Sequence, residues 1–328
     1  MTLIGLGLAV IAGFGPMMVY AALITVFDRY EKEPLWLMLA AFGWGAIVAA
    51  GLALVVNTVF GVGVAALTGD ERLTEITTAV ISAPLVEETV KGLAVLIIFL
   101  LFKREFNSLL DGVIYGALVG FGFAATENVL YIFNGFSAGG FAGLVLLTFF
   151  RAVGIAFLHA SLTALTGTGL AALRVLGSDW RYLAAPAGYA AAITGHFLHN
   201  LMASADNSLL CLFQLGVNWM GYLTLLAFMI WLVWREGRVM RRQLEEELRT
   251  GLITAQEYQT ACSIPGQLSA RIAALGRPDT QGKLFDLLGQ LAFSKELVSR
   301  RGVERELDAA RSVDVLRTRI AQLRTQTL

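Results

Sequence analysis

The residues best suited to chemistry in this chain are acids placed inside apolar sequence. Glu87 and Glu88 interrupt the run TTAVISAPLVEETVKGLAVLIIFLLF, and Glu127 interrupts GALVGFGFAATENVLYIF. A charged side chain at the centre of a bilayer costs about 2.5–3.5 kcal/mol on insertion scales, so such residues must pair with one another or line a wet cavity. Ionisable residues within membrane segments are therefore candidates for a functional site.

The paired glutamates suit general-base chemistry. Glu87 and Lys91 are four residues apart, so they share a helix face, and Glu88 can reach the same lysine. One acid can pair with Lys91 while the other stays free to act as a general base near neutral pH. The alternative is a buried ion pair that only holds helices together, but one acid would suffice for that.

A second polar position follows in the FAATEN segment. Glu127 and Asn128 lie there, and Arg151 is the expected counter-ion of one of the membrane acids. In the alternative interpretation, Glu127 is a buried acid that Arg151 satisfies and that has no chemical role. Asp111, with Tyr115 one turn later, is expected nearer the membrane interface as a supporting residue.

All three histidines of the chain lie in hydrophobic segments. His196 and Asn200 are four residues apart and face the same way, and both side chains can donate hydrogen bonds to a developing oxyanion. His199 is equally consistent with an ordinary buried interhelical hydrogen bond. His159 is a candidate for a metal ligand, an acid or base, or a polar contact between helices.

Composition indicates that membrane helices hold these residues. The chain has 328 residues, of which 56% are hydrophobic and 15% charged, and its mean hydropathy is +0.67. A soluble domain has about 25% charged residues, and about 20 apolar residues cross a bilayer. We therefore predict an all-α, polytopic membrane helix bundle with about seven transmembrane helices. They are expected at about 3–27, 35–64, 77–102, 109–133, 141–173, 183–205 and 208–234.

Basic residues in the connections predict the orientation. One side carries them in pairs: Arg29 and Lys32, Lys103 and Arg104, Arg174 and Arg181. The opposite side carries only Arg72. Because basic residues favour the cytoplasmic side, we expect a multi-pass protein of the cell membrane with its N-terminus outside and its C-terminus in the cytoplasm.

The sequence changes character after the last apolar segment. Residues 235–328 hold more than half of the 25 Lys and Arg residues, and apolar residues recur there at helical spacing among mixed charges. Thr254 and Glu257 have the spacing of a capping box. We expect a transmembrane domain at 1–234 and a cytoplasmic helical tail at 235–328 with about three to five helices. The tail either binds a partner or self-associates, or is a solvated helical region.

Six motifs in order resemble the PrsW family of intramembrane proteases, over about residues 15–205. They are DRYEKEP at 28–34, EETVK at 87–91, DGVIYG at 111–116, FAATEN at 123–128, the stretch 151–159 and HFLHN at 196–200. More distantly, the EExxK, FxxxE and HxxxN pieces are similar to those of the CAAX prenyl endopeptidase superfamily. The Glu127 position and the spacing of Lys91 differ from that superfamily but match the PrsW variant.

The resemblance implies cleavage of a membrane-tethered substrate, which in characterised members is an anti-sigma factor cut at or near the outer face. Glu87 and Glu88 match the essential acidic pair. Glu127 takes the place of a histidine in the prenyl endopeptidases, and His196 and Asn200 match their oxyanion-binding pair. The leading hypothesis is an endopeptidase in which a glutamate activates water without a cofactor.

Two other hypotheses stay open. In the first, zinc is held by His159, His196 and Glu127 while Glu87 acts as the base, although no HExxH motif is present. In the second, the chain is a proton- or metal-coupled transporter, but it lacks the internal repeat that many transporters have. The expected partners are the lipid bilayer and a single-span membrane protein substrate, with no nucleic acid.

Overall fold

The computed structural model describes residues 2–205, 207–273 and 280–325, which contain helices and short connections and no strand. The predicted all-α class is confirmed. Four helical stretches are long and apolar enough to cross a membrane: Thr2–Phe27, Leu35–Thr68, Leu109–Val175 and Ser208–Arg249. The chain is therefore a multi-pass membrane protein.

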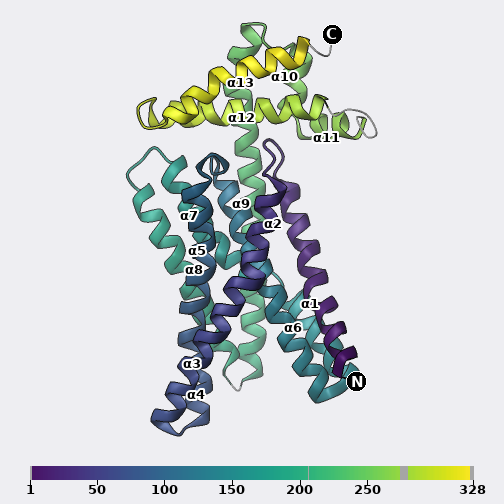
Figure 1. Ribbon diagram of the computed structural model, residues 1–328, viewed down its shortest axis with the longest axis vertical. Coiled ribbons are helices and arrows are strands. Elements are labelled where there is room, and N and C mark those ends of the chain that lie inside the picture. Colours follow the sequence, from purple (N-terminus) through teal and green to yellow (C-terminus); the bar gives the residue numbers. More distant parts are fainter. Residues whose placement is uncertain (1, 206, 274–279, 326–328) are drawn as a thin grey trace.

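The helices follow one another with short connections. In chain order they are α1 (Thr2–Ile24), η1 (Thr25–Phe27), α2 (Leu35–Gly43), η2 (Trp44–Ala49), α3 (Ala50–Thr68), α4 (Glu71–Thr77), η3 (Thr78–Ser82), α5 (Ala83–Leu101), η4 (Lys103–Glu105), α6 (Leu109–Phe149), η5 (Phe150–Gly154), α7 (Leu158–Val175), α8 (Arg181–Ala203), α9 (Ser208–Arg249), α10 (Ala255–Ala261), α11 (Ile264–Ala273), α12 (Thr280–Arg301) and α13 (Leu307–Thr325). Helices α1–α9 form an elongated bundle, α10–α13 lie across the C-terminal end of α9, and the chain termini lie at opposite ends (Figure 1).

The four apolar stretches differ from the seven predicted crossings. The predicted segments 109–133 and 141–173 both fall within Leu109–Val175, which departs from helical geometry at Gly140. Gly140 has φ 59° and ψ −144°, a conformation that favours glycine. A Cβ atom on Gly143 would lie 2.1 Å from the carbonyl oxygen of Gly135, so the chain folds back on itself there. The predicted segments 77–102 and 183–205 form α5 and α8 but are not among the four apolar stretches, and α5 carries three charged residues.

Helix α6 is the centre of the bundle, and all its residues from Leu109 to Ala125 are buried. Its glycines bring it against the backbone of α7. A Cβ atom on Gly116 would lie 2.5 Å from the carbonyl oxygen of Thr163, and one on Gly120 would lie 2.4 Å from that of His159. Because no side chain separates the two backbones, the position of α7 along α6 is tightly fixed.

In the part of the chain that the structure describes, three π-helical turns, η2, η3 and η5, interrupt the membrane helices. Such turns leave α-helical hydrogen bonds unmade and occur often at functional sites. In each turn one backbone carbonyl accepts a hydrogen bond from a side chain of another helix. The pairs are Ala46 with Thr126 at 2.6 Å, Ala79 with Asn200 at 2.7 Å, and Ala152 with Tyr20 at 2.8 Å.

The tail begins as a direct continuation of the last membrane helix. Helix α9 ends at Arg249, two residues before Gly251, whose φ is 74°. Helix α10 begins with the predicted capping box of Thr254 and Glu257. The described part of the tail holds four helices, α10–α13, and α12 packs on the 28–34 connection, where a Cβ atom on Gly289 would lie 2.0 Å from the carbonyl oxygen of Tyr30.

Candidate active site

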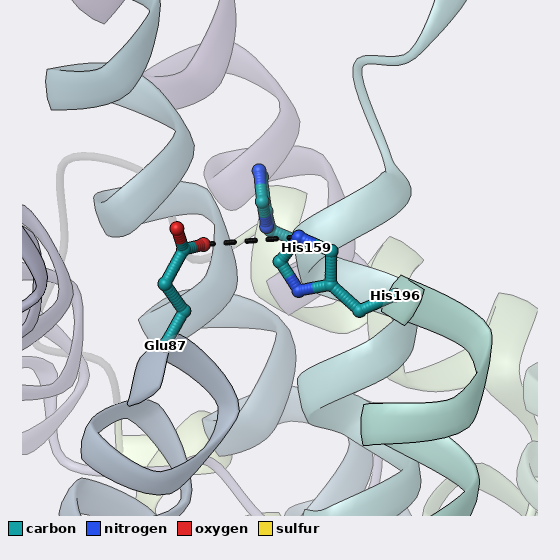
Figure 2. Close-up of side chains that lie close together, drawn as sticks. All are labelled: Glu87, His159 and His196. Carbon is teal, nitrogen blue, oxygen red and sulfur yellow. Dashed lines mark ion pairs between the residues drawn. The ribbon is translucent and has the colours of Figure 1, made fainter. Parts of the chain in front are cut away.

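The acids and histidines singled out from the sequence meet between α5, α6, α7 and α8. Helix α5 supplies Glu87, α7 supplies His159 and α8 supplies His196, and the three side chains point toward one another (Figure 2). The rings of His159 and His196 lie edge to face with their centroids 5.2 Å apart. Residues separated by more than one hundred positions in sequence therefore form one cluster.

Glu88 is the enclosed member of the acidic pair. Its Oε1 atom lies 2.5 Å from Nζ of Lys91 and 2.9 Å from Nδ1 of His196, and Thr163 donates to its Oε2 atom at 3.4 Å. Both Glu88 and Lys91 are 0% exposed. A buried charge is stable only when it is paired and hydrogen-bonded, and Glu88 satisfies both conditions.

Glu87 is the member that faces open space. It lines a cavity of about 700 Å³, whose lining does not include Glu88. The Oε2 atom of Glu87 is buried and has no hydrogen-bond partner among the described residues. It lies 3.8 Å from Nε2 of His196 and 3.9 Å from Nζ of Lys91. Glu87 thus has a lone pair available on a carboxylate beside a cavity.

The second acid of the site is held by an arginine and a histidine. The guanidinium of Arg151, in η5, donates a short hydrogen bond to Oε2 of Glu127 and a second bond of 2.7 Å to Oδ1 of Asn128. His159 Nε2 lies 2.8 Å from the same Glu127 oxygen. The sequence predicted a counter-ion role for Arg151, and the structure pairs it with Glu127.

The partners of the two imidazoles assign their neutral tautomers. An ammonium only donates, so Nδ1 of His159, which lies 3.1 Å from Nζ of Lys91, accepts, and its Nε2–H donates to Glu127. The carboxylate of Glu88 accepts from Nδ1–H of His196. The other ring nitrogen of His196, Nε2, faces Glu87 and in the neutral form of the ring carries the lone pair.

One group of side chains in the described ranges could hold a metal ion. Glu87, His159 and His196 each offer one ligand atom, and these atoms all lie within 4.8 Å of one another. Two histidines and one glutamate are a donor set of catalytic zinc sites, and zinc-binding histidines typically donate their other N–H to a carboxylate, as His196 does to Glu88. The orphaned Oε2 atom of Glu87 also fits a cation.

This donor set differs from the one predicted. The sequence placed Glu127 with the two histidines and left Glu87 as the base, whereas the structure groups Glu87 with them. Glu127 is instead bound to Arg151, which already supplies its positive partner. The difference arises because Arg151 and His159 both contact Oε2 of Glu127, whereas Oε2 of Glu87 has no hydrogen-bond partner among the described residues and lies 3.8 Å from Nε2 of His196.

The cavity also contains polar residues that the sequence analysis missed. Gln214 and Asn218, one turn apart on α9, both lie within hydrogen-bonding distance of Nδ1 of His199, at 2.8 and 3.1 Å. The sequence could have indicated this contact, because it has two amide side chains four residues apart, and so on one helix face, in an otherwise apolar segment. Asn200 lines the same cavity, but one amide N–H donates to the carbonyl oxygen of Ala79.

Asp111 lies apart from this site. It forms a capping box with Ser108 at the start of α6. Nearby, the hydroxyl of Tyr115 donates a short hydrogen bond to Glu33 of the DRYEKEP connection. The structure therefore places these residues where the first connection meets α6, near the tail helices, rather than beside Glu87.

Comparison with known proteins shows the family to which the chain belongs. The family model described as "PrsW family intramembrane metalloprotease" matches residues 33–234. Protease PrsW of Geobacillus kaustophilus (strain HTA426) is 32% identical over 121 residues, which cover 37% of this chain and 50% of that protein. Protease PrsW of Clostridioides difficile (strain 630) is 35% identical over 119 residues, which cover 36% of this chain and 48% of that protein. The chain thus spans about half the length of these curated relatives, and no solved structure matches it significantly.

Proposed function

We propose that this chain, which belongs to the PrsW family, is an intramembrane endopeptidase that cleaves a membrane-anchored protein with water activated at Glu87. One observation carries the proposal. Glu87, which lines a cavity of about 700 Å³ within the helix bundle, has a buried carboxylate oxygen with no hydrogen-bond partner among the described residues. A hydrolase needs such a base together with room for a peptide segment and a water molecule.

The proposed reaction begins with a water held between Glu87 and His196. Glu87 takes one proton as the water oxygen bonds to the scissile carbonyl carbon, while Nε2 of His196, beside Glu87, accepts a hydrogen bond from the other O–H. The carbon–nitrogen bond then breaks, and the proton on Glu87 passes to the leaving amine. The products are a carboxylic acid and an amine, so the atoms balance.

Oxyanion stabilisation is assigned to donors that line the cavity. Asn200 retains a second amide N–H beyond the one given to Ala79, and the Arg151 guanidinium has more N–H groups than its two described acceptors use. His196 is better suited to hold the water than the oxyanion, because its N–H is given to Glu88. This changes the predicted oxyanion pair from His196 and Asn200 to Asn200 and Arg151.

The same cluster suits a zinc ion. Glu87, His159 and His196 would hold it, and bound zinc would supply Lewis-acid polarisation of a carbonyl or a water. His159 must then give up its contact with Lys91 or with Glu127, since both of its ring nitrogens are engaged. Lys91 and Glu88 keep the cluster in place in either form.

We assign the substrate to single-span membrane proteins of the anti-sigma-factor type, on the strength of the resemblance. The cavity lies toward the N-terminal end of α9, where Ser204 and Ser208 line it, and α10–α13 lie at the other end of α9. With the predicted orientation, the N-terminus is outside, the tail is cytoplasmic, and cleavage falls in the outer half of the bilayer. The proposed division is a transmembrane protease domain at 1–234 and a tail at 235–328 that regulates the protease or binds a partner.

The test uses the purified full chain in lipid vesicles with a single-span test substrate. Wild type, Glu87→Gln and the control Glu71→Gln, an exposed acid in α4, are compared with and without a chelator, and bound metal is measured. The proposal expects cleavage by wild type and the control and none by Glu87→Gln. Full cleavage by Glu87→Gln would refute it. Cleavage that survives chelation without bound metal indicates a glutamate mechanism, and loss restored by zinc indicates the metal form.

A further inference from the structure

A second cavity lies at the opposite end of the bundle from the active site. It has a volume of about 580 Å³ and lies between η1 with the connection that follows it, the second half of α9 and the start of α11. On α9 it coincides with the change from apolar to basic sequence, because Trp234 is the last apolar residue before Arg235 and Arg238. The cavity is therefore at the membrane–water boundary on the tail side.

One wall of this cavity is apolar and open. Val26, Ile230 and Trp234 line it and are 43%, 56% and 54% exposed. These side chains continue the lipid-facing surfaces of α1 and α9, so an acyl chain from the bilayer can lie against them. Tryptophan at this depth is typical of the membrane interface.

The other wall carries positive charge without acidic partners. Arg29 and Arg241 line the cavity, and neither forms an ion pair within residues 2–205, 207–273 and 280–325. Within the described ranges, the Arg241 guanidinium donates one long hydrogen bond, of 3.5 Å, to the carbonyl oxygen of Cys262. No Asp or Glu is among the described residues that line the cavity. Two guanidinium groups beside apolar side chains match a phosphate group attached to hydrocarbon.

We propose that this cavity binds one anionic phospholipid, with its phosphate between Arg29 and Arg241 and an acyl chain along Val26, Ile230 and Trp234. The lipid connects η1 and α9 to α11 and so joins the membrane bundle to the tail helices. Basic pockets between helices on the cytoplasmic side of membrane proteins recognise lipid headgroups by this chemistry. This site is separate from Glu87 and does not depend on proteolysis.

The experiment measures lipid binding to the delipidated full chain in neutral detergent by native mass spectrometry. Phosphatidylglycerol is compared with phosphatidylcholine, for wild type, Arg29→Gln, Arg241→Gln and the double variant. The control is Arg249→Gln, an exposed arginine on the same helix that pairs with Glu245 beyond the cavity. We expect a preference for phosphatidylglycerol that falls about fivefold for each arginine lost and is unchanged in the control.

Three outcomes would overturn the proposal. They are equal affinity for the two lipids, a preference kept in the double variant, and displacement of phosphatidylglycerol by millimolar inorganic phosphate, which would identify a free phosphate site. Arg29→Lys and Arg241→Lys are controls for misfolding. They keep the positive charge and should retain most of the lipid binding. Weakening of the wild-type preference at high salt is the corresponding expectation without any substitution.

Discussion

The Nδ1 atom of His196 lies 2.9 Å from Oε1 of Glu88, and this hydrogen bond gives Glu88 a different environment from that of Glu87. Glu88 accepts hydrogen bonds from the imidazole N–H and from the ammonium of Lys91, so its charge is paired and hydrogen-bonded within the protein. The other ring nitrogen, Nε2, lies beside Glu87 and carries a lone pair when the imidazole is neutral. Adjacent glutamates thus have distinct surroundings, which leads to distinct expected effects of substitution.

Substituting each glutamate in turn separates stability from activity. Glu88→Gln removes the charge closest to Lys91 and should lower the free energy of unfolding by about 3–5 kcal/mol, as breaking a buried ion pair does. Glu87→Gln should leave the melting temperature nearly unchanged while abolishing cleavage. Thermal unfolding in detergent and cleavage of a test substrate measure the two effects. A lower melting temperature for Glu87→Gln than for Glu88→Gln would contradict this assignment.

Zinc affinity distinguishes the two possible carboxylate ligands. The geometry predicts that Glu87→Gln and His196→Ala lose zinc binding, whereas Glu127→Gln weakens it by no more than about 10–100-fold, the effect of removing a residue that orients a ligand. Equilibrium dialysis of the purified chain against zinc gives the affinities. Loss of zinc in Glu127→Gln and His196→Ala, with full binding kept in Glu87→Gln, would restore the set predicted from the sequence.

The Arg151–Glu127 pair should behave as one unit. Arg151→Gln leaves Glu127 without its counter-ion, and Glu127→Gln leaves the guanidinium without its acceptor, so each single change is costly. In the double variant the two amides pair, and the loss of unfolding free energy should be smaller than the sum by about 1–3 kcal/mol. Unfolding curves for wild type, the two single variants and the double variant provide the double-mutant cycle. Additive losses would mean that the pair does not act as a unit.

The sequence predicted the all-α membrane class, the family and the helix carrying each chemical residue, because apolar length and motif order are local properties. It could not say which glutamate faces the cavity. That choice depends on the rotation of α5, which the π-helical turn η3 alters without leaving a clear sequence signal. The polar contacts of Gln214 and Asn218 were missed because they form only when α9 packs beside α8.

The close contact between α6 and α7 predicts that Gly120 does not tolerate a larger residue. Gly120→Ala would place a Cβ atom 2.4 Å from the carbonyl oxygen of His159, so α7 must move and the His159–Glu127 bond must change. We expect a lower melting temperature and strongly reduced cleavage. Gly63→Ala in α3 is the matched control, since its Cβ would meet nothing within 4 Å. Equal behaviour of the two variants would show that the helix contact does not position His159.

The stability of the folded chain should depend on pH through Asp28, which lies in the 28–34 connection. Burial raises the pKa of Asp28 to about 7, with Asp111 and Asp286 adding to the shift, while the Glu33 N–H and Lys32 oppose it. An unfolded aspartate has a pKa of about 3.9, so between these values the folded chain keeps a proton that the unfolded chain releases. The Asp28 contribution is therefore full below about pH 4, falls as pH rises toward 7 and is constant above.

The measurement compares melting temperatures at pH 5.5 and pH 8 for wild type and Asp28→Asn. Wild type should melt at a lower temperature at pH 8, and the variant should show a smaller difference, since an amide cannot lose a proton. Burial also raises the pKa of Glu33, so part of the dependence should remain in the variant. A wild type that becomes more stable at pH 8 would contradict the direction of the shift.

The π-helical turns have a consequence for how the chain tolerates changes in length. Each such turn contains the equivalent of one extra residue, and removing one residue rotates the rest of a helix by about 100°. A one-residue deletion within η3 would carry Glu87 away from its cavity, although every residue of α5 would be retained. Homologues of this protein that align without gaps at η3 should therefore have Glu87 and Glu88 at the same rotation of α5, whereas an insertion or deletion at η3 would mark a different rotation.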